Sequence, residues 1–170
     1  MNKLNVFNTY WSPWKYPSNW FRNAKTFFRQ IKWAYQRITR GFCDCDYWDL
    51  DTYLSELLAQ SLKKLADDGN GYPGTEEFPT YESWQEYLYK IIDLLRFSLN
   101  EDMPNEYEEA WMKTWEDKDN FLESVNNPTP EEKEITDKYL KKENENELLK
   151  RKAQDEALDM IKHVYNNLWD

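Results

Sequence analysis

The sequence predicts an all-α fold: a single domain of about five helices, with a basic aromatic N-terminal helix and a long charged C-terminal helix. Apolar residues recur every three or four positions along most of the 170-residue chain, which is the period of an amphipathic helix. Only four Gly and seven Pro are present, too few for the many turns of an all-β chain. We expect residues 1–125 to form a helical core with a basic N-terminal arm, and residues 126–170 to add a helix to the same domain.

The first predicted helix begins at a cap on Ser18 or Asn19 and ends near Arg40, since Gly41 readily takes a positive φ. Its apolar residues share one face: Phe21, Ala24, Phe27, Phe28, Ile31, Tyr35 and Ile38. Its basic residues lie on another face, beside Trp33: Arg22, Lys25, Arg29, Lys32 and Arg40. Three interpretations stay open for this helix: it packs on acidic helices of its own chain as an ordinary core helix, lies on an anionic membrane surface, or binds nucleic acid with Trp33 stacking on a base.

Start signals for four more helices lie at Asp46, at Thr80, after Pro104 and at Thr129–Pro130. The last start combines a cap, a proline at the first helical position and Glu132 at the third. This helix is expected to reach about Asn167. Its middle, residues 141–147, has no apolar side chain, so it either projects into solvent or breaks there.

Charge is distributed unevenly along the chain, whose net charge is −10. The first 43 residues hold eight Lys and Arg and no acidic residue, whereas the other 127 hold 14 basic and 32 acidic residues. Such asymmetry indicates that the basic arm contacts either the acidic body or an anionic partner. There is no apolar run of about 18 residues, so no membrane span is expected. Because the N-terminus also lacks an apolar signal core, we expect a cytoplasmic protein with reduced thiols at Cys43 and Cys45.

Four carboxylates crowd the stretch after Gly41, at positions 44, 46, 49 and 51. Asp46 resembles a helix cap, but four carboxylates cannot all bond the few free amides of one helix start. We therefore expect Asp44, Asp46, Asp49 and Asp51 to be divided between capping and other contacts. Those left over face Arg37 and Arg40 across the Gly41 turn or face a partner, with Trp48 partly buried beside them. The alternative, a hard-cation site, lacks the spacing of a calcium loop.

No catalytic apparatus, cofactor or metal site is predicted. The chain lacks a nucleophile motif and a phosphate-binding glycine loop, and Cys43 and Cys45 have no second pair with which to complete a zinc site. One formal enzyme pattern exists, that of all-helical nucleotide pyrophosphohydrolases, in which four carboxylates bind magnesium. Its members here are Glu106, Glu109, Glu134 and Asp137. So acidic a chain contains such spacings often by chance.

One stretch resembles a known group of proteins. Residues 32–42 read Lys-Trp-Ala-Tyr-Gln-Arg-Ile-Thr-Arg-Gly-Phe, residues 44–54 read Asp-x-Asp-x-Trp-x-Leu-Asp-x-Tyr-Leu, and residues 71–73 read Gly-Tyr-Pro. This pattern resembles a family of small proteins encoded by tailed bacteriophages, over roughly residues 20–97. The family has no established activity, so the resemblance implies a context only: the cytoplasm of an infected bacterial host.

The expected function is a non-enzymatic binding protein, an anti-defence inhibitor of a bacterial host protein that could mimic DNA. The alternative is a sponge for nucleotide second messengers, in which arginines hold phosphates and aromatic rings stack on a base. Direct binding of nucleic acid is not expected, and a homo-oligomer stays open. The candidate binding residues are Arg29, Trp33, Arg37, Arg40, Asp44, Asp46, Trp48, Asp49, Asp51 and Tyr72.

Overall fold

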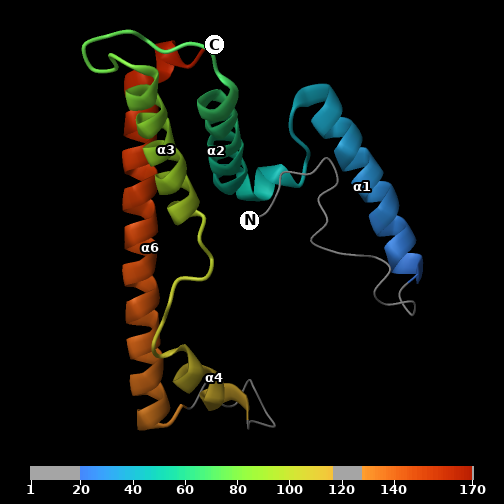
Figure 1. Ribbon diagram of the computed structural model, residues 1–170. Coiled ribbons are helices and arrows are strands. Elements are labelled where there is room, and N and C mark those ends of the chain that lie inside the picture. Colours follow the sequence, from blue (N-terminus) through green and yellow to red (C-terminus); the bar gives the residue numbers. More distant parts are fainter. Residues whose placement is uncertain (1–19, 117–127, 170) are drawn as a thin grey trace. The chain divides into compact units, whose positions relative to one another are not determined.

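A computed structural model of the chain describes residues 20–116 and 128–169 (Figure 1). Within these ranges there are five α-helices and no strand, so the prediction of an all-α fold is confirmed. The helices are α1 (Trp20–Arg40), α2 (Leu50–Asp68), α3 (Tyr81–Ser98), α4 (Glu108–Glu116) and α6 (Pro130–Val164). Two short 3-10 helices, η3 (Asp46–Asp49) and η4 (Tyr165–Asn167), precede α2 and follow α6. None of the helices in the described ranges is both long and apolar enough to cross a membrane.

The chain forms two compact units, residues 1–62 and residues 63–170. The first unit contains α1, η3 and most of α2. The second contains the end of α2 together with α3, α4 and α6. The C-terminal helix thus shares a unit with α3 and α4, while the predicted division after residue 125 stays a prediction.

The core of the second unit lies between α3 and α6, which run side by side (Figure 1). Fully or nearly fully buried are Trp84, Leu88, Ile91, Ile92 and Leu95 of α3, and Ala153, Ala157, Ile161 and Val164 of α6. The small alanines of α6 allow the large side chains of α3 to approach closely. Burying each Leu or Ile side chain contributes about 1.5–3 kcal/mol, so this seam stabilises the second unit.

The N-terminal half of α6 holds the segment around α4 through polar contacts. The Asn105 side chain donates to the Tyr139 carbonyl (3.2 Å) and to Glu143 Oε1 (2.7 Å). Asn146, buried in the middle of α6, donates to the Pro104 carbonyl at 3.3 Å. These contacts use polar residues of a stretch without apolar side chains, so α6 does not break there and continues through 35 residues.

Local capping chemistry sets the helix starts that the sequence predicted. Thr80 and Ser83 form a capping box at α3, and Thr129 and Glu132 form one at α6, which has Pro130 in its first turn. Each box satisfies amides that have no partner within the helix. Both predicted starts are confirmed.

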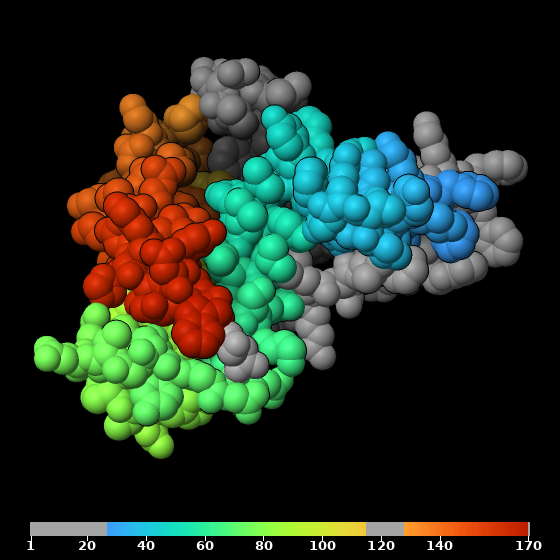
Figure 2. Space-filling view, turned by 90° about the horizontal axis from the view of Figure 1, so that it is seen from above, coloured from blue at the N-terminus to red at the C-terminus, as the bar shows by residue number. Residues whose placement is uncertain are grey.

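The loop between α2 and α3 is anchored at both of its ends. The Tyr81 hydroxyl donates to the carbonyls of Ala66 and Gly69 at 3.0 and 2.9 Å. Farther along the loop, Oε2 of Glu77 lies 2.8 Å from Nε2 of His163 in α6. Figure 2 shows this loop, in green, beside the C-terminal turns of α6, in red.

Candidate functional site

The turn between α1 and α2 brings most of the predicted site residues together. Gly41 has a φ of +83°, and its amide donates to the Arg37 carbonyl at 3.0 Å, which closes the last turn of α1. The predicted helix end at Gly41 is therefore confirmed. The chain then passes through residues 42–45 into η3. We call residues 41–46 the elbow.

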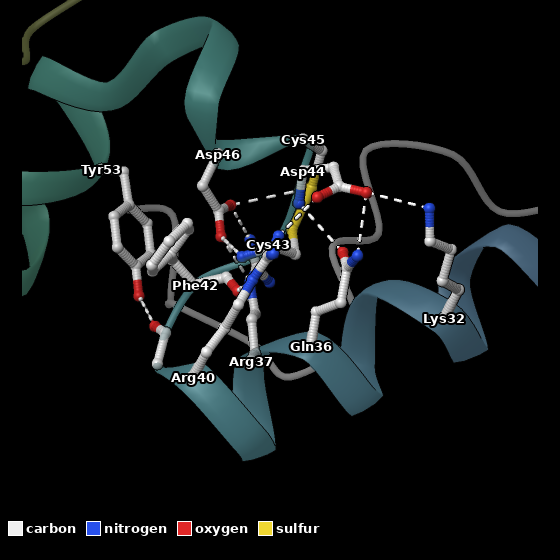
Figure 3. Close-up of a disulfide and its surroundings, with 11 residues drawn as sticks. Lys32, Gln36, Arg37, Arg40, Phe42, Cys43, Asp44, Cys45, Asp46 and Tyr53 are labelled. Atoms are coloured by element: carbon white, nitrogen blue, oxygen red, sulfur yellow. Dashed lines mark hydrogen bonds and ion pairs between the residues drawn. A yellow bond between two sulfur atoms is a disulfide. The ribbon is translucent and has the colours of Figure 1, made fainter.

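Asp46 is nearly buried and binds Arg37 with both carboxylate oxygens (Figure 3). The Arg37 Nε–Asp46 Oδ2 distance is 3.0 Å, and Oδ2 also accepts the Cys43 amide at 2.8 Å. Hydrogen bonding to Asp46 raises the pKa of Arg37. The prediction that Asp46 caps a helix is wrong, because its carboxylate compensates a guanidinium instead of free helix amides.

Asp44 is exposed and is held by three side chains of α1 (Figure 3). Its Oδ2 accepts from Gln36 at 2.8 Å and from Lys32 at 2.9 Å, and its Oδ1 pairs with Arg40. Its amide donates back to Gln36 Oε1 at 3.0 Å. The hydrogen bonds from Gln36, Lys32 and Arg40 hold the pKa of Asp44 far below its usual range. The expectation that surplus carboxylates face α1 across the turn is confirmed for Asp44, and Asp46, which was expected to cap a helix, does the same.

Asp49, Asp51 and Trp48 face solvent. Asp49 Oδ1 accepts from the Thr52 hydroxyl at 3.0 Å, and Asp51 lies in the first turn of α2. Trp48 is 90% exposed, so the prediction that it is partly buried is wrong. A 3-10 helix has about three residues per turn, so Trp48 projects from a different side of η3 than the buried Asp46.

Cys43 and Cys45 form a disulfide, so the expectation of reduced thiols is wrong in this structure. The elbow brings their Cα atoms to 5.4 Å, inside the usual range for a disulfide. Donor atoms of Cys43, Cys45 and Asp46 all lie within 4.8 Å of one another, the geometry of a possible metal site. In this state, however, the sulfurs are bonded to each other and Asp46 is paired with Arg37.

Only some of the residues proposed to bind a nucleotide are placed where they could do so. Arg37 and Arg40 are engaged by Asp46 and Asp44, so their positive charges are already compensated. The Arg29 guanidinium lies 5.0 Å from the centroid of the Trp33 ring. Tyr72 is half-exposed and belongs to the second unit, whereas the other candidates belong to the first.

The pyrophosphohydrolase pattern does not assemble. Glu109 pairs with Lys113 and Glu134 with Lys138, both at 2.7 Å. Among the side chains that the structure describes, the only group of three or more potential metal ligands is the one in the elbow. The predicted spacing therefore does not produce a four-carboxylate magnesium site in this part of the chain.

Sequence reasoning missed how the first unit distributes its apolar side chains. Its described buried residues are small or polar apart from Leu62: Gln30, Ala34, Cys43, Asp46, Ser55, Ala59 and Leu62. The large apolar residues of α1 are instead 46–73% exposed: Phe27, Phe28, Ile31, Tyr35 and Ile38, which we call the α1 apolar face. Their helical spacing predicts one shared face, but it does not distinguish an ordinary core face from an exposed one.

This exposure is concentrated in one part of the chain. Of the twenty exposed large hydrophobic side chains in the described residues, eleven lie within residues 27–57. Large exposed apolar patches are uncommon on monomeric proteins and mark interaction surfaces. Comparisons with protein-family models, curated proteins and solved structures found no match to this chain.

Proposed function

We propose that this protein is a non-enzymatic binding protein, an anti-defence inhibitor encoded by a tailed phage, that binds a host protein in the cytoplasm of an infected bacterium. The phage context comes from the sequence resemblance. The observation that carries the binding function is the α1 apolar face, five large side chains of one helix left exposed. Exposed Trp48 adds a residue type that often dominates binding energy at protein interfaces.

The charges around α1 favour a protein partner over an anionic membrane. Three basic residues at the C-terminal end of α1, Lys32, Arg37 and Arg40, pair with Asp44 or Asp46, which reduces their attraction for anionic lipid headgroups. With these three charges compensated, the α1 apolar face is the surface that this end of the helix offers to a partner. Such a helix face fits an apolar groove on another protein.

DNA mimicry is the more specific form of this proposal. It is supported by the net charge of −10 and the acidic composition after Cys43. If the target is a DNA-binding protein, its complex with this chain should weaken steeply with added salt and should compete with DNA.

The test is affinity purification from infected bacterial cells with matched variants. Ile38→Asp places a charge on the α1 apolar face, and Leu149→Asp places one on an exposed position of α6. We expect a reproducible host protein with the wild type and with Leu149→Asp, and its loss with Ile38→Asp. Equal capture by Ile38→Asp, or no reproducible protein with the wild type, contradicts the proposal.

Nucleotide sequestration is the second candidate, favoured by the placement of Arg29 over Trp33. An arginine beside a partly exposed aromatic ring can pair with a phosphate while the ring stacks on a base. A ligand at 100 times its dissociation constant stabilises the folded state by about 2.7 kcal/mol. Thermal-shift screening with cyclic and ADP-ribose-type nucleotides should then show a shift that Trp33→Ala abolishes, whereas no shift with the wild type excludes this candidate.

A further inference from the structure

The Cys43–Cys45 disulfide contributes little to the stability of the fold. It joins residues only two positions apart. A disulfide stabilises a fold mainly by restricting the unfolded chain, and the effect is smallest for the shortest loops. In a bacterial cytoplasm, where the proposed function places this protein, thiols are kept reduced, and disulfides that form there are usually transient and take part in redox chemistry. These two arguments favour a redox role for this bond over a stabilising one.

The two sulfur-bearing residues differ in their access to solvent. Cys43 is fully buried, whereas Cys45 is half-buried. Thiol–disulfide exchange requires a thiolate to approach one sulfur of the bond directly. An external thiolate can reach Cys45 more readily, which leaves Cys43 as the leaving group.

The elbow is held by contacts that do not involve the sulfur–sulfur bond. Asp44, between the two cysteines, is fixed by Gln36, Lys32 and Arg40, and Asp46 is fixed by Arg37 (Figure 3). The Cys43 amide also donates to Asp46 at 2.8 Å. None of these bonds requires the disulfide, so we expect the two thiols to stay close to each other when it opens.

The reduced state also has a partner for one thiol. Cys45 Sγ lies 3.7 Å from Asp46 Oδ1, within the range in which a thiol hydrogen can be donated to a carboxylate. The elbow therefore accommodates both redox states with little change in its backbone. Such an arrangement favours reversible cycling.

We propose that Cys43 and Cys45 form a redox-active pair that exchanges with dithiols. A thiolate of the dithiol attacks Cys45 Sγ, the bond between Cys45 and Cys43 breaks, and Cys43 leaves as a thiolate that takes up a proton. The second thiol of the dithiol, losing its proton, then attacks the dithiol's own sulfur in the mixed disulfide, and Cys45 leaves as a thiol. One dithiol is oxidised to a disulfide, the pair is reduced to two thiols, and two electrons and two protons are transferred.

The equilibrium test uses the full chain in buffers of defined reduced-to-oxidised dithiothreitol ratio. Free thiols are alkylated and counted by mass spectrometry, and circular dichroism follows the fold. We expect both cysteines to change together as one two-electron couple, with unchanged helix content. A chain whose cysteines stay reduced at every ratio, or whose disulfide opens only on unfolding, overturns the proposal.

Single-cysteine variants test the assigned roles. Cys43→Ala leaves the accessible Cys45, and Cys45→Ala leaves the buried Cys43. We expect Cys45 to react with an aromatic disulfide reagent at least tenfold faster than Cys43, and equal rates contradict the assignment. In a chain that keeps both cysteines, the substitution Asp44→Ala should slow re-formation of the disulfide after reduction. The reason is that residues 41–46 are then held by fewer bonds to α1.

An experiment with added metal distinguishes the redox pair from a metal site formed by the same two thiolates. The reduced chain is titrated with Zn²⁺ and then exposed to oxidised dithiothreitol. We expect the disulfide to re-form at an unchanged rate. One zinc ion per chain that blocks re-formation overturns the proposal in favour of a metal site.

Discussion

Arg37 and Asp46 face each other across the Gly41 turn as a nearly buried ion pair, with side chains 12% and 4% exposed. The pair joins the end of α1 to the start of η3, over nine positions of sequence. Each charge compensates the other where little water is available, so neither can be removed alone without leaving an unpaired charge. The fold of the first unit therefore depends on this contact more than on any of its exposed ion pairs.

Replacing Arg37 with Met should destabilise the elbow strongly. Breaking one side of a buried ion pair costs about 3–5 kcal/mol, and because Arg37 keeps some exposure we expect about 2–3 kcal/mol. Hydrogen exchange of amides in α1 and residues 41–46 measures the effect. The matched control is Lys64→Met, which removes an exposed pair with Asp68 and should cost less than about 1 kcal/mol. Equal effects of the two substitutions contradict the prediction.

Acid should loosen the elbow only at low pH. Because hydrogen bonds from Gln36, Lys32 and Arg40 lower the pKa of Asp44 in the folded state, its stabilising contribution is complete above the unfolded value of about 3.9 and is lost as pH falls below it. The carboxyl carbon shift of Asp44 by NMR should show no titration near pH 4. In Gln36→Ala the pKa should move upward, toward the ordinary value, and an identical titration in both proteins contradicts this account.

Leu88→Ala should be among the most damaging substitutions in the second unit. Leu88 is fully buried in the seam between α3 and α6. Such a truncation removes apolar burial and leaves a cavity, at a cost of about 2–5 kcal/mol. Urea unfolding followed by circular dichroism measures the change. Leu149→Ala, at an exposed position of α6, should change the free energy of unfolding by less than about 0.5 kcal/mol.

Asn105→Ala should release α4 from α6 while leaving the α3–α6 seam intact. It removes donors to the Tyr139 carbonyl and to Glu143, and the acceptor of the Tyr107 amide. We expect about 1–3 kcal/mol of local destabilisation, seen as faster hydrogen exchange in α4 and unchanged exchange in α3. Asn166→Ala, at an exposed position after α6, is the control. Uniformly faster exchange in α3 and α4 would show that the contact is not local.

Asp49→Asn and Asp51→Asn test whether the exposed acids beside Trp48 belong to the partner surface. Both carboxylates face solvent, so each substitution should change the free energy of unfolding by less than about 1 kcal/mol. We expect each to weaken partner capture from infected cells. If capture is unchanged for both, these residues serve only the start of α2 and the functional surface lies elsewhere.

The end of α1 and the starts of α3 and α6 could be predicted from the sequence because they depend on chemistry within one turn. Gly41 ends α1 through its positive φ, and Thr80 and Thr129 each bond an amide three residues ahead. The facing of Asp44 toward Arg40 was also predictable, since a turn separates a basic helix from surplus carboxylates. These features need no information about distant parts of the chain.

The features that the sequence did not predict depend on three-dimensional placement. Periodicity identified the α1 apolar face, but the same pattern is compatible with a core face or an interface. The direction of Trp48 depends on the 3-10 geometry of η3, which has no distinct sequence pattern. Reduced thiols were expected from the predicted cytoplasmic location, whereas the turn at Asp44 brings Cys43 and Cys45 together.

The continuity of α6 has a mechanical consequence. At about 1.5 Å per residue, its 35 residues extend roughly 50 Å. The contact of α4 lies in its N-terminal half, where Trp111 stacks on Tyr139. Contacts with α3 reach its C-terminal half, as in the bond from Tyr87 to the Met160 carbonyl. Since α6 is unbroken, we expect a displacement at its α4 end to shift the packing at its α3 end as well.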